Sequence, residues 1–513
     1  MCIFWGKIHY MYAFENNRTP FHPKQEPRYD CPLSTKNLSD LFSHCGDFEK
    51  REFIYGLDGS VRLNLCWIDG LVSTPMLSQN VLRPLTQLAR CGVACDQHTA
   101  WQRIAAGGVY NCVVRRCEDM DSLVELITHG FCALIFDELS AALCFEVRSE
   151  INRAISEPTL EKALKGAKDS FVENIRINTA LIRRRISDPA LKLLESQLGR
   201  KSATRAALIY IEGVACPETV EAVASRLDAM DVDALLATGI VEESVVDHPD
   251  SPFPQLIHTE RPDRFSMYLT EGRVGILIDG IPVGLVLPVT MAEFMKVTGD
   301  SGKHYIVASS IAMLRYAALL LGALLPALYV GIAMYHQEMI PTKLLLSIIE
   351  AKRDVPFSTA LEVLGMLMAF SLLQEAGLRL PNPIGDTVSI IGALIVGQSA
   401  VEARVVSPIA IIVVAVSGIA SYTLPSQDLS FAVKLCRLIL LLAAIVGGLY
   451  GVGIGICLIM LHLAKMDSFG VNYTSPLSDG LPGGLLRLFL RLPKRKNKFR
   501  DPLLNTPDRR KQK

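Results

Sequence analysis

An amide and a carboxylate lie one helical turn apart in an apolar stretch of the C-terminal half of the chain. Gln398 and Glu402 share a face if residues 387–403 are helical, because positions four apart are neighbours on a helix. Polar groups are costly in a bilayer unless they face water or protein, and a ring of carboxylates attracts cations. The pair is therefore a candidate pore lining. The alternative is that Glu402 only pairs with Arg404 at the membrane surface.

Small residues beside this pair predict close packing of helices. Ser389, Ala393 and Gly397 recur every four residues, and such a ladder lets another helix approach closely. The glycines at 447–455 are also more typical of helix packing than of a phosphate-binding loop, because they lie within an uncharged run. These positions are predicted to hold helices together.

Signatures of catalysis are absent from the sequence. Residues 299–303 are too short for a phosphate-binding loop, and no two histidines have the spacing of a zinc protease. The irregularly spaced cysteines are typical of reduced, buried thiols. A zinc site is the less favoured alternative, and its spacing matches no common zinc knuckle; it would use Cys91, Cys95, His98, Cys112 and Cys117. We therefore expect that the chain is not an enzyme and that it binds no cofactor and no metal.

Long uncharged runs divide the chain into a water-soluble N-terminal part and a membrane part. About 20 apolar residues cross a bilayer as a helix. A helical transmembrane domain is predicted over residues 308–466, with spans at 317–334, 387–403, 405–424 and 438–461. Residues 357–373 are predicted to form a re-entrant or interfacial helix instead.

Both ends of the chain are predicted to lie in the cytoplasm. Residues 1–14 lack the basic start and long apolar run of a secretory signal. From residue 462 onward there are 12 Lys and Arg against 4 Asp. A basic tail, here 467–513, stays cytoplasmic and lies against anionic membrane lipid. Nucleic-acid binding is the weaker alternative for this tail.

Two sequence signals recur at a constant offset in the soluble part. An apolar run closed by an acid and a glycine ends at Asp69 and again at Glu212, 143 positions later. A hairpin pattern turns at Asp137 and again at Asp279, 142 positions later. A constant offset indicates duplication. We expect two duplicated α/β lobes at 49–160 and 201–300, a poorly structured extension at 1–48 and a helical connector at 161–200.

Two further segments are candidates for an inter-lobe or subunit contact. The first is the arginine cluster Arg183, Arg184 and Arg185, for which a solvated helix face is the favoured interpretation and a lipid-facing patch is a further alternative. The second is a proline-rich, extended segment that either braces a neighbouring lobe or subunit or forms a contact surface. Its candidate residues are Pro252, Phe253, Pro254, Glu260 and Arg261.

Several long motifs in one order carry a resemblance to a known family. They are SFVENIRINTALIRRRI (170–186), SPFPQ with TERPDR (251–264), LLPALYVGIAMYHQEMIPTKLLLSI (324–348), AGLRLPNPIGDTVSIIGALIVGQSAVEA (376–403) and SFGVNY (468–473). In these motifs the chain resembles the A subunits of the GerA-type spore germinant receptors, including their stage V sporulation AF paralogues. The chain departs from the family in its first 45 residues, at Lys165–Lys168, and at Leu367 and Ser371, where family members tend to carry Glu.

The resemblance implies a multi-pass protein of the spore inner membrane with cytoplasmic lobes. It further implies a transporter-like B subunit that binds the nutrient, a lipoprotein C subunit, and a homo-oligomeric, nutrient-gated ion channel. We expect an α/β soluble region of two duplicated lobes followed by an all-α multi-span membrane domain. The expected function is a channel subunit that triggers spore germination. The alternative is a non-conducting scaffold that organises the receptor complex.

Overall fold

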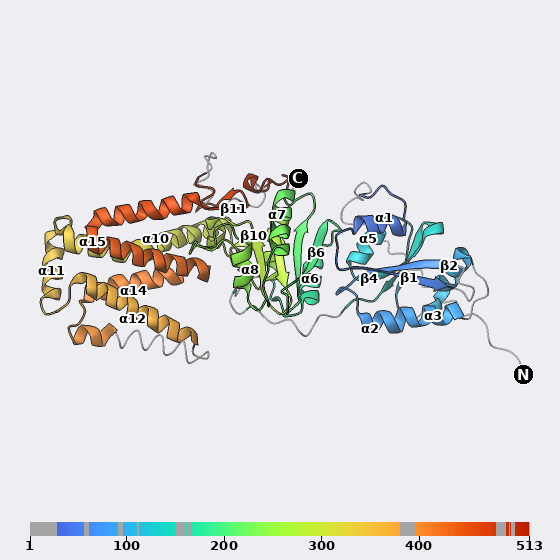
Figure 1. Cartoon of the computed structure of the whole chain (residues 1–513), viewed down its shortest axis with the longest axis horizontal. Helices are drawn as coiled ribbons and strands as arrows, with labels where there is room; N and C mark the ends of the chain where they lie inside the picture. Colours follow the sequence, from blue (N-terminus) through green and yellow to red (C-terminus); the bar gives the residue numbers. More distant parts are fainter. Residues whose placement is uncertain are drawn as a thin grey trace, which may run out of the picture. The chain divides into compact units, whose positions relative to one another are not determined.

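The computed structural model describes residues 28–55, 61–90, 96–109, 112–149, 158, 161, 166–379, 397–478, 489–491, 493 and 498–511. The chain forms two units, and Figure 1 labels their helices and strands. The first unit contains residues 28–42 and 48–149, and the second contains 43–47 and the chain from 150 onward.

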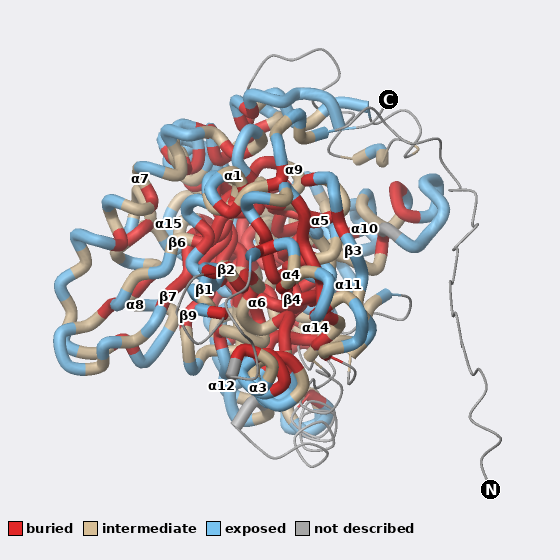
Figure 2. The backbone as a smooth tube through the Cα atoms, turned by 90° about the vertical axis from the view of Figure 1, so that its right-hand side faces the viewer, coloured by how far each residue is buried: buried red, intermediate tan, exposed pale blue. Residues whose placement is uncertain are grey.

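The first unit is built around one antiparallel sheet with the strand order β1-β2-β4-β5-β3. Strand β4 is apolar and buried along its whole length, as the burial colours of Figure 2 show. Since alternate residues of a strand point to opposite faces, β4 needs a cover on both sides. Figure 1 shows α1 and α5 on one face of the sheet and α2 and α3 on the other.

The elements of the first unit begin earlier than predicted. Residues 35–41 form a helix that Ser34 caps by accepting a hydrogen bond from the backbone N–H of Asn37. The predicted unstructured extension therefore ends before residue 34. The elements are α1 (Thr35–Leu41), β1 (Phe48–Tyr55), β2 (Val61–Ile68), α2 (Thr74–Met76), the π-helical turn η1 (Leu77–Leu82), α3 (Arg83–Arg90), α4 (Gln97–Arg103), the π-helical turn η2 (Ile104–Gly108), β3 (Val114–Cys117), α5 (Met120–Thr128), β4 (Phe131–Phe136), the 3-10 turn η3 (Asp137–Leu139) and β5 (Ala141–Glu146).

The second lobe repeats the sheet of the first. Its strand order is β6-β7-β9-β10-β8, which is the first order with each strand number raised by five. Asp137 directly follows β4 and Asp279 directly follows β9, so the two hairpin turns are equivalent. The elements are α6 (Ile175–Arg183), β6 (Leu191–Leu198), β7 (Thr204–Ile211), α7 (Pro217–Asp228), α8 (Thr238–Val245), β8 (Ile257–Thr259), α9 (Pro262–Glu271), β9 (Val274–Ile278) and β10 (Gly284–Leu287). The prediction of two duplicated α/β lobes is confirmed.

The predicted helical connector was wrong in its second half. Residues 161–200 contain helix α6 but also β6, which is the edge strand of the second sheet. Strand β6 pairs with β7 from Leu191↔Ile211 to Leu198↔Thr204. The second lobe therefore begins well before residue 201.

The C-terminal part is helical. Among the described residues, three helices are long and apolar enough to cross a membrane, within Tyr305–Tyr335, Thr359–Gly377 and Gln427–Lys465. The elements are the 3-10 turns η4 (Met291–Met295) and η5 (Thr298–Gly302), α10 (Tyr305–Tyr335), η6 (Gln337–Met339), α11 (Thr342–Lys352), α12 (Thr359–Arg379), α14 (Pro408–Tyr422), α15 (Gln427–Lys465), the short strands β11 (Asp467–Ser468) and β12 (Val471–Asn472), and η8 (Pro502–Leu504).

Helix α12 covers most of the segment for which we predicted a re-entrant or interfacial helix, residues 357–373. It is one continuous helix of 21 residues, and part of it is long and apolar enough to cross a membrane. Glu362 does not exclude a longer helix, because its side chain is buried in the first turn, 3.0 Å from Lys352 Nζ.

The last predicted span, 438–461, is not one straight helix. The backbone of α15 turns at Gly447 (φ −126°, ψ 15°) and Gly448 (φ 57°, ψ −140°). Beyond the turn, a Cβ on Gly451 would lie 2.0 Å from the carbonyl oxygen of Ala443, and a Cβ on Gly455 would lie 2.9 Å from Leu440 Cδ2. The two arms of α15 therefore pack against each other as a hairpin, and glycine is what allows their close approach.

Candidate functional site

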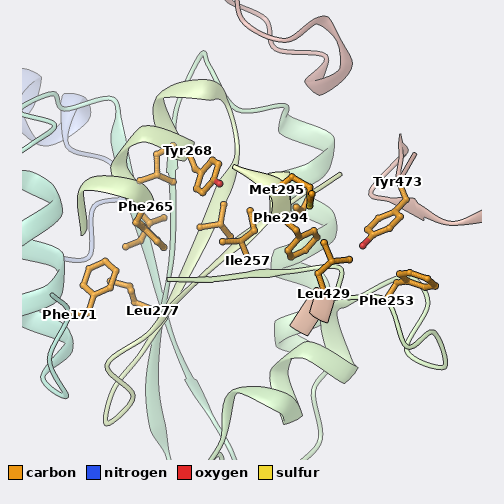
Figure 3. Close-up of a cluster of buried hydrophobic side chains, with 14 of the residues drawn as sticks. Phe171, Phe253, Ile257, Phe265, Tyr268, Leu277, Phe294, Met295, Leu429 and Tyr473 are labelled. Carbon is orange, nitrogen blue, oxygen red and sulfur yellow. The ribbon is translucent and has the colours of Figure 1, made fainter. Parts of the chain in front are cut away.

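The second lobe and the membrane helices share one apolar core, which we call the junction. Figure 3 shows Phe294 and Met295 of η4 near Leu429 of α15, with Phe253 and Tyr473 beyond them. All five side chains are buried. Because protein cores are close-packed, the lobe and α15 cannot move independently here without opening a cavity. The junction is therefore the candidate functional site, the place where a change in the lobe reaches the membrane helices.

The proline-rich segment forms one wall of the junction. The ring of Phe253 lies 6.0 Å from that of His462 and 6.5 Å from that of Tyr473. The hydroxyl of Tyr473 donates a 2.8 Å hydrogen bond to the carbonyl oxygen of Pro254. Pro252 is exposed, whereas Phe253 and Pro254 are buried. The segment thus packs against the end of α15 in its own unit, where we had expected a neighbouring lobe or subunit.

Histidines of the second lobe contact both ends of α15. At its start, His258 Nδ1 lies 3.3 Å from Asp428 Oδ2. Just beyond its end, His248 Nε2 lies 2.8 Å from Asp467 Oδ1. The imidazole of His462, in the last turn of α15, lies 2.9 Å from the hydroxyl of Ser251. Polar contacts therefore surround the apolar junction.

Charge and burial act in opposite directions on His258. Burial alone would lower its pKa, but the hydrogen bond to Asp428 and the charges of Glu242 and Asp428 outweigh burial and raise the pKa. Burial also raises the pKa of Glu242, against the lowering effect of His258. These groups line a cavity of about 430 Å³ between the lobe and the start of α15.

Arg261 is internal to the second unit, where we had expected an inter-lobe or subunit contact. Its side chain is 1% exposed. Its Nη2 donates to Asp263 at 2.7 Å and to the carbonyl oxygen of Ala167 at 3.0 Å. The carbonyl oxygen of Glu260 accepts from the backbone N–H of Phe171 at 2.7 Å. These bonds fasten the start of α9 to the segment that precedes α6.

The arginine cluster divides into three environments. Arg183 is completely buried and donates two 2.8 Å hydrogen bonds to the carboxylate of Asp47. Arg184 is exposed, whereas Arg185 is partly buried and bonds to Asp169. A solvated face therefore describes only part of this cluster. A subunit contact does not fit Arg183, because its partner lies inside the same unit.

The candidate pore residues are only partly described. Residues 397–402 are helical, Gly397 is buried, and Gln398 and Glu402 are exposed on this helix. A Cβ on Gly397 would lie 4.0 Å from Ile411 Cγ2, so this helix packs near α14. Ser389 and Ala393 lie outside the described residues. Arg404 pairs with Asp354 at 2.5 Å rather than with Glu402.

Comparison with known proteins shows which family the chain belongs to. A sequence profile described as "Bacillus/Clostridium GerA spore germination protein" matches residues 36–503. The chain belongs to the GerA family. The chain is 34% identical over 474 residues to spore germination protein B1 of Bacillus subtilis (strain 168), covering 92% of this chain and 97% of that protein. It is also 34% identical over 476 residues to the uncharacterized membrane protein YfkQ of the same organism, covering 91% of each.

Two further similarities have lower sequence identity. Stage V sporulation protein AF of Bacillus subtilis (strain 168) is 29% identical over 411 residues, covering 80% of this GerA chain and 83% of that protein. The crystal structure of the N-terminal domain of the A subunit of the Bacillus megaterium spore germinant receptor GerK3 is 26% identical in sequence. The structural alignment covers 51% of this chain and 98% of that domain, with a TM-score of 0.41. The chain is a membrane-associated member of the germinant receptor A-subunit family.

Sequence reasoning missed the ion pairs of two buried carboxylates in this GerA chain. Glu293 of η4 lies 3.1 Å from Arg273 and 2.5 Å from Lys296. Burial would raise the pKa of Glu293, but these basic neighbours outweigh it and lower the pKa to about 2. Asp300 of η5 accepts a 2.5 Å hydrogen bond from Arg315 of α10. In the sequence, these pairs are visible only as charged residues before and within the apolar helix α10.

A polar bridge links three helices of this GerA chain. The hydroxyl of Ser417 in α14 donates to the carbonyl oxygen of Gly322 in α10 at 2.9 Å. The same hydroxyl accepts a 3.0 Å hydrogen bond from Arg437 Nη1 in α15. All three residues are buried. The bridge fixes the register of the helices, because separating a buried guanidinium from its hydrogen-bond partner costs free energy.

The described part of the basic tail packs on the second lobe. Arg500 Nε donates to the carbonyl oxygen of Thr270 at 3.0 Å, and Lys511 Nζ lies 3.1 Å from Glu271. Residues 498–511 therefore lie on the lobe's side of the membrane helices. Among the described residues no three metal-ligating side chains come together. Cys91 and Cys95 of the alternative zinc site lie outside that range.

Proposed function

We propose that this chain is the A subunit of a nutrient germinant receptor and contributes to an oligomeric, nutrient-gated ion channel. Its place is the spore inner membrane, with the lobes and the tail on the cytoplasmic side. Its partners are a transporter-like B subunit, a lipoprotein C subunit and further copies of the chain. Family membership over residues 36–503 supports the receptor assignment.

The observation that carries the channel assignment is the setting of Glu402. The carboxylate is exposed on a helix in the membrane part of the chain. Within the described ranges no cationic side chain forms an ion pair with it, since Arg404 pairs with Asp354. An ionised carboxylate in such a place needs water or a partner charge. One copy per subunit around an axis would supply the negative ring that attracts cations.

Cation flux from liposomes tests the channel assignment. The receptor is reconstituted with its B and C subunits, and cation efflux is followed after the nutrient is added. Glu402→Gln keeps the side-chain volume and removes the charge, so cation preference and flux should fall while protein level and assembly stay unchanged. Glu350→Gln, at an exposed position of α11, is the matched control and should leave flux unchanged.

Two results would contradict the channel. Nutrient-dependent flux that is identical in wild type and Glu402→Gln would remove Glu402 from the path. No flux from a receptor that still binds nutrient and assembles would favour the non-conducting scaffold. The double variant Asp354→Arg with Arg404→Asp is a structural control, because it exchanges the two charges and preserves the observed ion pair. Protein level and assembly should therefore stay normal in this variant, and any change in its flux would come from conduction rather than from folding.

A further inference from the structure

One imidazole joins the second lobe to the first turn of a membrane helix. His258 lies on β8, its Nε2 is 3.7 Å from Glu242 Oε2 on α8, and its Nδ1 is 3.3 Å from Asp428 Oδ2 on α15. Glu242 belongs to the lobe, whereas Asp428 belongs to the helix hairpin. The same ring therefore faces one carboxylate from each side of the contact.

The charges around this imidazole favour its cationic form. The cavity beside it is also lined by Glu260, which follows β8, by Arg264 of α9 and by Glu161. Arg264 forms a hydrogen-bonded ion pair with Glu161. Its positive charge is therefore largely compensated, and the carboxylates that lie nearest to His258 are those of Glu242 and Asp428. The cavity lets water and protons reach the ring.

We propose that His258 is a protonation-dependent latch between the second lobe and the start of α15. The imidazolium attracts Glu242 and Asp428 at once and so holds the helix to the lobe. The neutral ring keeps at most one hydrogen bond and loses the charge attraction to both carboxylates. Proton loss therefore loosens the start of α15 and leaves the apolar junction to hold it alone.

The sign of the pH dependence follows from the raised pKa of His258. Contact with Asp428 and Glu242 favours the protonated ring against burial. By linkage, protonation must favour the contact by the same factor. The latch is fully formed below the ordinary histidine pKa and is lost as pH rises through the raised pKa. This inference concerns the lobe and the hairpin and does not depend on ion conduction.

Histidine modification measures the latch directly. The full chain in lipid nanodiscs is treated with diethylpyrocarbonate, which acylates neutral imidazole, from about pH 5 to about pH 9. Mass spectrometry follows His258 and, as internal reference, His98, which is exposed in the first unit. Asp428→Asn and Glu242→Gln should each move the His258 profile to lower pH and leave that of His98 unchanged. Each pH unit of this movement corresponds to about tenfold in the contact equilibrium.

Hydrogen exchange gives the mechanical readout on the same samples. After correction for the intrinsic pH dependence of exchange, amides 427–433 should be less protected above the His258 transition than below it. His258→Gln should abolish that difference, and amides of strand β4 should not respond. An unshifted His258 profile in both carboxylate variants would overturn the latch. Equal protection of residues 427–433 on both sides of the transition would overturn it independently.

Discussion

The buried pair of Asp47 and Arg183 offers the sharpest test of the packing argument. Both side chains are at most 1% exposed, and two hydrogen bonds of 2.8 Å join them. Asp47→Ala removes both bonds and leaves a guanidinium buried without its counter-charge. Breaking a buried ion pair in this way costs about 3–5 kcal/mol. The unfolding constant of the second unit should therefore rise by about two to four powers of ten.

Pulse proteolysis of the detergent-solubilised chain across a urea gradient measures this change. The matched control is Arg176→Ala, because the pair of Arg176 and Glu195 is partly exposed, at 24% for each side chain. Such pairs contribute about 0–1 kcal/mol. The double variant Asp47→Leu with Arg183→Met replaces both charges by apolar groups and should recover most of the loss. If Asp47→Ala matches Arg176→Ala, the buried-charge reasoning is refuted.

Three further predictions concern the hairpin, the junction and the helix bridge. Gly448→Val should lower the yield of folded protein, because residue 448 has φ +57° and a Cβ there would lie 2.9 Å from the ring of a tyrosine of α10. Gly453→Ala is the control and should not lower the yield, because no atom lies within 4 Å of a Cβ at that position. The folded-state pKa of Glu293 is about 2, so its carboxylate stabilises the fold above about pH 4, and this stabilisation is lost as pH falls through about 2. The free energy of unfolding of Glu293→Gln, measured across the same acid range, should lack this decrease. Ser417→Ala removes a partner of Arg437 and should cost about 1–3 kcal/mol in detergent melting, and no loss would contradict the bridge.

The duplication could be predicted because its signals are local. Acid-glycine turns after apolar runs mark the ends of β2 and β7, at Asp69 and Glu212, and the hairpins at Asp137 and Asp279 mark β4 and β9. A constant offset between such signals requires no knowledge of long-range contacts. Strand β6 escaped prediction because its sequence, LKLLESQL, has leucines at both helical and strand spacings, and only pairing with β7 decides between them.

The site could be predicted less well, because its contacts join distant parts of the sequence. Arg183 and Asp47 are separated by 136 positions, and His258 and Asp428 by 170. Neither residue type nor spacing reveals such a partner. The hairpin in α15 escaped for a different reason: an uncharged run indicates that a segment can enter the membrane but does not fix the path of the backbone within it. The glycines at 447–455 correctly predicted close helix packing, but they did not predict that the backbone turns at 447–448.

Both ends of the α15 hairpin are tied to the same lobe, and this has a mechanical consequence. Asp428 at the start contacts His258, and Asp467 beyond the end contacts His248, while apolar side chains fill the space between. A displacement of the second lobe must therefore move both arms of the hairpin together, or break one polar contact and open part of the core. Close-packed contacts of this kind change between discrete arrangements rather than deforming continuously. A displacement of the lobe would thus shift the hairpin as a unit, and α10, which is linked to α15 through Ser417 of α14, would follow.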